Sequence, residues 1–286
     1  MGNCIKEQKN IFKPDKWFGL LIFVTVAAVI IRILFYNHIS LDYKACLLPW
    51  AKEISRYGGF PSLGHSIGNY NVPYMVFMSM FYYLPGEYLY WLKSFSVIFD
   101  FLLAFGAAKI VYLITEDPSK KRIKAIITFS AVIMLPTVLI NSAFWGQCDS
   151  IYAALAVFSL YFLQKDKLLA SSVFFGLSFC FKLQAVFILP VFILVYFSKI
   201  RNNQWAKNKI IKFLIIPLIF LIVDLPAIIA GRSIQDVLAI YINQSNQYNV
   251  LSYNYSNILF YFNYMPAYMY SFFKYGFLFF TFCIFA

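Results

Sequence analysis

Long runs of apolar residues constrain this chain more than any other feature. Trp17–Tyr36 and Tyr88–Ile114 each reach the length of about 20 residues that a helix needs to cross a bilayer. Backbone groups inside lipid have no water to bond with, so these runs are expected to be helices. Polar and apolar residues do not alternate along them, as they would in an outer-membrane barrel. The sequence therefore predicts an all-α, polytopic integral membrane protein.

The composition agrees with this class. Of the 286 residues 62% are hydrophobic and only 13% are charged, whereas soluble domains carry roughly twice that charged fraction. Further apolar runs raise the expected number of spanning helices to about eight. These runs are Ala125–Phe144, Ile151–Leu163, Leu168–Phe181, Val186–Phe197, Ile210–Ala230 and Ala267–Ala286.

The net charge of +12 does not predict a nucleic-acid partner, because the basic residues lie in short loops between apolar runs. Such loops act as topology signals in membrane proteins. The short segment Pro73–Leu84 leaves two topologies open: it spans the membrane, or it is a re-entrant or interfacial part of the first outer loop. We favour the second, because it places most of the basic residues outside the apolar runs on the inner side, beginning with Lys120, Lys121, Arg122 and Lys124.

This topology predicts a single transmembrane module over residues 1–286, with a cytoplasmic N-terminus and outer segments at residues 37–88 and 231–266. The last apolar run ends at Ala286 without a polar flank, so we expect a fragment of a longer protein or a shortened member of its class. The five cysteines have no paired or metal-type spacing, which predicts neither a disulfide framework nor a zinc site.

The first outer loop is rich in polar and aromatic residues. It begins with Asp42, and Cys46–Tyr57 has the pattern of an amphipathic helix lying in the membrane interface, with Arg56 on its polar side. The loop ends in Asn69-Tyr70-Asn71-Val72-Pro73-Tyr74. A carboxylate just beyond a helix end is commonly a solvated loop residue, and that reading of Asp42 stays open.

Two further polar points fall on the same predicted side. The turn Trp145-Gly146-Gln147-Cys148-Asp149 joins two spans; it is either a functional element or an interfacial Trp anchor with a helix-capping Asp. The motif Phe181-Lys182-Leu183-Gln184 interrupts an apolar run, and Lys182 is either a site residue or a snorkelling side chain.

Two acids lie deeper in the apolar runs. We expect Asp100 to pair with a base on its own helix, Lys93 or Lys109. Asp224, two residues before Pro226, is expected to cap an irregular stretch or to line a cavity.

Two acids and a cation at one membrane face suit a reaction in which a group is transferred from a lipid phosphate to a hydroxyl. A carboxylate accepts the proton of an attacking hydroxyl, and a lysine offsets the charge of a departing phosphate. The sequence has no glycine-rich phosphate loop, so it does not predict a nucleotide site.

These ordered motifs, from Asp42 to about Met265, resemble the GT-C superfamily of integral-membrane glycosyltransferases. The chain is most similar to bacterial proteins related to PIG-V, a eukaryotic GPI mannosyltransferase, and it also resembles dolichyl-phosphate-glucose glucosyltransferases. Relatives have an acid before the tyrosine that ends the first outer loop, and here that position is Asn69.

The resemblance implies an inverting transfer with Asp42 as general base and Asp149 as a second catalytic acid. It implies that substrate is bound by Lys182, which faces the donor phosphate, and by Gln147, Trp145, Tyr70, Arg56 and Gln184. We expect no metal and no other cofactor, although two acids are able to hold a divalent ion.

The leading hypothesis is a membrane hexosyltransferase, most simply a mannosyltransferase. Its expected partners are a polyprenyl-phosphate sugar, an extracytoplasmic glycan, lipid or protein acceptor, and the cell membrane. Two alternatives stay open: a flippase or small-solute transporter, and an inactive or truncated relative that works with a partner. A transporter more often shows paired broken helices at the midplane, which this sequence lacks.

Overall fold

The computed structural model describes residues 16–202, 211–245, 275–276 and 279. The chain divides into two compact units, residues 1–237 and 238–286. Helix α14, Ile240–Ser245, lies in the second unit. Most of the predicted outer segment 231–266 and of the run Ala267–Ala286 lies outside the described residues.

Regular structure in the described ranges is entirely helical, which confirms the all-α prediction. The long helices of the first unit are α2 (Lys16–Leu34), α5 (Tyr88–Ile114), α6 (Pro118–Ile133), α8 (Asp149–Gln164), α9 (Leu168–Phe181), α10 (Leu189–Asn202) and α12 (Ile215–Ile229). The shorter pieces are η1 (Tyr43–Leu47), α3 (Leu48–Arg56), η2 (Phe60–Gly64), α4 (Val72–Phe81), α7 (Pro136–Leu139), η3 (Ile140–Phe144), η4 (Leu183–Ile188) and α13 (Ile234–Leu238).

Three helices in the described ranges are long and apolar enough to cross a membrane by themselves: Trp17–Leu34, Tyr88–Ile114 and Ile211–Ile229. The segments Pro118–Ile133 and Pro136–Phe144 make a fourth span if the 48° bend between them lies within one crossing. The remaining apolar helices have 10–17 residues. The structure thus confirms a multi-helix membrane protein, while the count of about eight spans stays a prediction.

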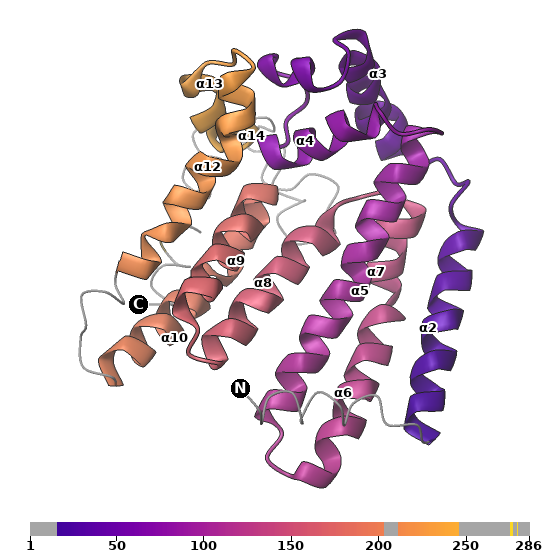
Figure 1. Cartoon of the computed structure of the whole chain (residues 1–286), viewed down its shortest axis with the longest axis vertical. Coiled ribbons are helices and arrows are strands. Elements are labelled where there is room, and N and C mark those ends of the chain that lie inside the picture. The colour runs from indigo at the N-terminus through magenta and orange to yellow at the C-terminus, as the bar shows by residue number, and fades with distance from the viewer. Residues whose placement is uncertain (1–15, 203–210, 246–274, 277–278, 280–286) are drawn as a thin grey trace. The chain divides into compact units, whose positions relative to one another are not determined.

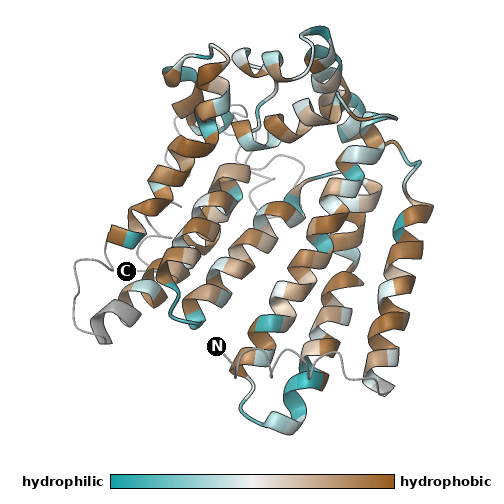
Figure 2. Ribbon diagram, viewed as in Figure 1, coloured by the Kyte–Doolittle hydropathy of each residue, from teal (hydrophilic) through white to brown (hydrophobic). Residues whose placement is uncertain are grey.

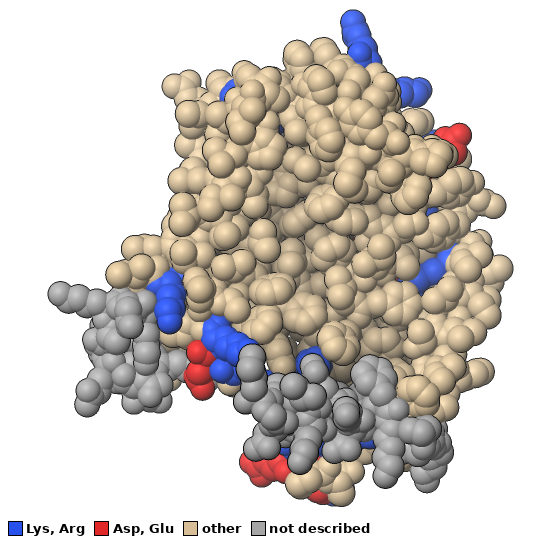
Figure 3. Space-filling model, viewed as in Figure 1, with Lys and Arg blue, Asp and Glu red and all other residues tan. Residues whose placement is uncertain are grey.

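The long helices of the first unit lie side by side, and the first outer loop covers one end of them (Figure 1). Apolar residues dominate along the helices, whereas polar residues gather towards both ends (Figure 2). On the face shown in Figure 3 the band between the two ends is mainly uncharged. This distribution matches helices that pass through lipid, with their loops in water.

Helix α4 lies across the end of the layer instead of running along it (Figure 1). It has only ten residues, seven of them buried, and packs on α9 and α12. This placement fits the interfacial alternative for Pro73–Leu84. Which side of the membrane each loop occupies stays a prediction.

The predicted amphipathic helix exists as α3, but it does not bury its apolar face in lipid. Ala51 and Ile54 lie in the protein's own core, together with Met75 and Met78 of α4. The helix is thus confirmed, and its place in the membrane interface stays a prediction. The pattern only requires an apolar partner, and the neighbouring helix α4 supplies it.

Asp100 pairs with Arg32 of α2, so the predicted pairing with Lys93 or Lys109 is wrong. The guanidinium Nη2 lies 2.9 Å from Asp100 Oδ2, and both side chains are almost completely buried. Lys93 and Lys109 are seven and nine residues from Asp100, about two turns or more along the helix axis, whereas only side chains three or four apart meet. Lys109 instead lies over the rings of Phe105 and Tyr161.

Asp224 is buried inside α12, which continues past it through Pro226 to Ile229. Asp224 therefore does not cap an irregular stretch.

Candidate active site

The turn between η3 and α8 places Gln147 and Asp149 at one end of the helical layer. Gly146 has φ +75°, a left-handed conformation that glycine adopts without strain. Its amide donates to the Ser142 carbonyl, and the amide of Gln147 donates to the Asn141 carbonyl, both at 2.9 Å. The chain then enters α8 at Asp149, whose carboxylate stands in the first helical turn.

Ser40 connects this turn to the segment that carries Asp42. The Ser40 hydroxyl donates to the Trp145 carbonyl at 2.7 Å and accepts the Tyr43 amide at 3.1 Å. Asp42 is exposed, and its carboxylate accepts a hydrogen bond from the Gln147 side-chain amide. The segment after α2 and the Trp145–Asp149 turn therefore form one surface around Asp42.

Tyr70 extends this surface from the far end of the first loop. Its hydroxyl donates to Gln147 Oε1 at 3.0 Å, and its ring packs edge-on against Trp50 at 5.3 Å. Burial raises the pKa of Tyr70 well above its usual value, and nearby acidic groups raise it further. The phenol thus stays protonated and keeps donating to Gln147.

A glycine makes room for this packing. Gly68 has φ +67°, and a Cβ there would come within 2.7 Å of the Trp50 ring. Both the backbone and the available space therefore require glycine two residues before Tyr70.

Lys182 and Asp149 form an ion pair at the other end of the cluster. The Lys182 side chain is only 11% exposed, and its ammonium lies 5.6 Å from the centre of the Tyr70 ring. Asn141 donates to the second carboxylate oxygen of Asp149 at 2.8 Å. The end of α9, just before Lys182, is tied to the first loop because Asn71 donates to the Cys180 carbonyl at 3.1 Å.

The structure thus brings together five predicted site residues, which come from three separate parts of the chain. They form a continuous polar chain in the order Asp42, Gln147, Tyr70, Lys182 and Asp149. In this order of contacts the two acids come first and last, and they are connected through an amide, a phenol and an ammonium.

Three other predicted substrate-binding residues do not join this chain. Trp145 contacts Ser40 through its backbone carbonyl, and the residue as a whole is 48% exposed. Arg56 is exposed at the end of α3 and Gln184 is exposed in η4. Within the described residues no contact links either of these side chains to the cluster. Gln184 follows Lys182 by two residues, yet the break after α9 directs it elsewhere.

Lys93 supports the Asp42 segment, and the sequence did not reveal this role. Its buried ammonium donates to the carbonyls of Phe35, Tyr36 and His38 at 2.7–3.1 Å. These carbonyls belong to the turn that follows α2 and leads to Asp42. The sequence shows only that Lys93 interrupts an apolar run, and this does not reveal that its partners are backbone carbonyls.

A second buried network holds the turn that carries Gln147. Asp100 accepts hydrogen bonds from Arg32, from Ser142 just before the turn, and from Ser150 just after it. Arg32 also donates to the Ile133 carbonyl at 2.9 Å, at the break between α6 and α7. The network therefore fixes both ends of the turn to α2 and α5.

Replacing Lys93 with methionine should lower the turnover of whatever reaction Asp42 supports. The three carbonyls would lose their shared donor, and a displacement of about 1 Å at a reacting group costs roughly 100-fold. We expect a loss of 10- to 100-fold in kcat, measured with the transfer assay described below. Lys109→Met on the same helix is the control, and equal losses in the two variants would contradict the positioning role.

The cluster offers neither an evident metal site nor a reactive thiol. Among the described residues no three His, Cys, Asp or Glu side chains converge as metal ligands. Burial raises the pKa of the Cys148 thiol to about 11, against the opposing effect of Lys182. Cys148 is therefore a poor nucleophile near neutral pH. The expectation that the reaction needs no metal stays a prediction.

Comparison with known proteins gives a partial match. No family model matches the chain, and no solved structure matches it. GPI mannosyltransferase 1 of Saccharomyces cerevisiae is 29% identical over 132 residues, which cover 46% of this chain and 32% of that protein. GPI mannosyltransferase 1 of Kluyveromyces lactis is 34% identical over 130 residues, which cover 44% of this chain and 31% of that protein.

The chain thus spans about a third of the length of these curated relatives. Over just under half of its own length, this helical membrane protein is similar to two GPI mannosyltransferases.

Proposed function

We propose that the chain is a membrane mannosyltransferase that takes a hexose, most simply mannose, from a polyprenyl-phosphate donor. The acceptor is a hydroxyl of a glycan, lipid or protein on the extracytoplasmic side of the cell membrane. The partial similarity to two GPI mannosyltransferases supports the class of sugar. The polar chain from Asp42 to Asp149 supports the reaction.

In the proposed reaction the acceptor oxygen attacks C1 of the sugar. A new C1–O bond forms as the bond from C1 to the phosphate oxygen breaks, and the departing phosphate keeps the electron pair. The proton of the acceptor hydroxyl moves to Asp42, which is exposed and able to meet it. A single displacement of this kind inverts the configuration at C1.

Lys182 offsets the charge of the departing phosphate. Its ammonium is nearly buried, and in such a site a cation stabilises developing negative charge more strongly than in water. In the unliganded protein this charge is paired with Asp149. Donor phosphate and Asp149 would then share the ammonium, so Asp149 keeps Lys182 in place between turnovers.

Gln147 and Tyr70 orient the base. The Gln147 side-chain nitrogen donates to Asp42, and its oxygen accepts from the Tyr70 hydroxyl. These two partners fix the orientation of the amide. This connection is the single observation that carries the proposal, because it joins the base to the cation through groups from two loops.

A transfer assay tests the function. The purified protein is incubated with polyprenyl-phosphate mannose and oligosaccharide or GPI-precursor acceptors, and the product is followed by mass spectrometry. We expect a mannosylated acceptor from the lipid donor, and none from GDP-mannose, because no glycine-rich phosphate loop is present in the sequence. Translocation of the lipid-linked sugar across vesicles without any transfer would instead establish a flippase.

A further inference from the structure

A cavity of about 210 Å³ lies beside Asp149, between α5, the α7–η3 segment and α8. Asn141 and Asp149 form its outer end, where α8 begins. Leu103, Val138 and Ala153 line it about one helical turn deeper, together with the Thr137 hydroxyl. The cavity is thus polar near the candidate site and mainly apolar within the helical layer.

One wall of the cavity is the α7–η3 segment, which follows a bend in the helix. The helical segments Pro118–Ile133 and Pro136–Phe144 meet at an angle of 48°. Thr137, which lines the cavity, is the second residue after this bend. Leu135 and Ile140 on either side of this stretch are 46% and 42% exposed, as expected for side chains that face lipid. A molecule dissolved in the bilayer therefore meets this cavity at a lipid-facing part of the protein.

Asp149 belongs to both the cavity and the polar chain. Its carboxylate accepts from Lys182 on one oxygen and from Asn141 on the other. An ionised carboxylate has about four acceptor positions, so capacity remains for hydroxyl donors. Sugar hydroxyls are such donors, and Asp149 is 38% exposed.

Asp42 is not among the residues that line this cavity. It is exposed beside Leu41, which is 85% exposed. Its hydrogen-bond partner Gln147 is two residues from Asp149, so the exposed surface at Asp42 adjoins the end of the cavity that Asp149 forms. A substrate that approaches Asp42 from the exposed surface therefore does not need to enter the cavity, and it meets the sugar at the end formed by Asn141 and Asp149.

We propose that this cavity receives the lipid-linked donor: the hexose lies against Asp149 and Asn141, and the first isoprenoid unit lies against Leu103, Val138 and Ala153. The donor is assigned to this side because the departing phosphate needs a cation, and Lys182 contacts Asp149. The acceptor hydroxyl then enters from the Asp42 side. This inference rests on the proposed function and adds the route of each substrate.

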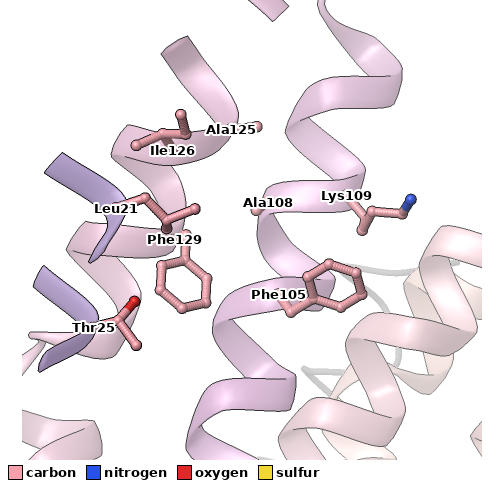
Figure 4. Close-up of a pocket in the computed structure, with 8 residues that line it drawn as sticks. All are labelled: Leu21, Thr25, Phe105, Ala108, Lys109, Ala125, Ile126 and Phe129. Atoms are coloured by element: carbon pink, nitrogen blue, oxygen red, sulfur yellow. The ribbon is translucent and has the colours of Figure 1, made fainter. Parts of the chain in front are cut away.

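A second cavity provides the matched control. It has a volume of about 200 Å³ and lies between α2, α5 and α6, lined almost entirely by apolar side chains such as Leu21, Ala108 and Phe129 (Figure 4). The Lys109 side chain points away from Phe129 and Leu21 (Figure 4). This cavity therefore has similar size and apolar walls, without the acid and amide that mark the proposed donor site.

Filling each cavity in turn tests the inference. Ala153→Phe should raise KM for polyprenyl-phosphate mannose by about tenfold or more, because the added ring occupies the donor space, with acceptor KM changed by less than about twofold. Ala108→Phe should change neither constant. A rise in acceptor KM with an unchanged donor KM in Ala153→Phe would overturn the assignment.

Photocrosslinking gives a readout that needs no turnover. With p-benzoylphenylalanine at position 138 we expect labelling by radioactive polyprenyl-phosphate mannose, displaced by unlabelled donor; at position 129 we expect none. Equal labelling at both positions would overturn the inference even if transfer is active. Labelling at position 138 alone, in a protein that transfers no sugar, would uphold the cavity as a lipid-phosphate site and reject the proposed enzyme.

Discussion

Asp42→Asn is expected to lower kcat of mannosyl transfer by roughly 100- to 10,000-fold, the usual contribution of a positioned general base. Asparagine keeps the size of the side chain and still offers an oxygen to the Gln147 amide. The geometry of the two loops is therefore retained, while the ability to take the acceptor proton is lost. Donor KM should change little, because Asp42 is at the far end of the polar chain from Lys182.

The measurement is single-turnover transfer at saturating donor and acceptor, with detergent extraction and thermal stability monitored in parallel. Asp117→Asn is the matched control, since Asp117 caps α6 by accepting the Ser119 amide and asparagine caps helices equally well. If Asp42→Asn retains full activity, Asp42 is not the base. Asp149 would then be the next acid to consider.

Asp100→Ala should destabilise the protein more than any other substitution considered. It would leave the Arg32 guanidinium buried without its carboxylate, and Ser142 and Ser150 would lose their acceptor. Removing one partner of a buried ion pair costs about 3–5 kcal/mol. We expect a clear fall in the thermal unfolding temperature in detergent, together with loss of transfer.

The double variant Arg32→Met, Asp100→Leu separates stability from positioning. Replacing both partners of a buried pair by apolar residues is often close to neutral, so most of the lost stability should return. Activity should stay low, because Ser142 and Ser150 would still lack the acceptor that holds the turn at Gln147. Recovery of both properties would show that the network supports folding alone.

Hydropathy was sufficient to locate most of the fold. The bounds expected for Tyr88–Ile114 and Leu168–Phe181 agree with α5 and α9, because an apolar run and a helix end at the same polar residues. The run Ala125–Phe144 was expected as one span, and the structure shows a bend in it just before Pro136 that the run did not predict. Proline removes a backbone donor, so it permits a break, but the angle depends on packing around it.

The candidate site could be predicted only in part. Asp42, Gln147 and Lys182 were found because polar residues at the ends of apolar runs are conspicuous and topology placed them on one side. Arg32 was not found as the partner of Asp100, since the two are 68 residues apart and only tertiary packing joins them. Arg56 fits the expected polar face of its helix, and it is exposed at the end of α3.

The Asp100 network also bears on how the chain enters the membrane during synthesis. Asp100 is the thirteenth of the 27 residues of α5, and an unpaired acid at the middle of a helix costs about 3 kcal/mol on insertion. Its partner Arg32 has already been synthesised in α2, whereas Ser142 and Ser150 follow 42 and 50 residues later. We therefore expect α5 to insert more readily while α2 is still close by, and the hydroxyls of Ser142 and Ser150 are added only afterwards.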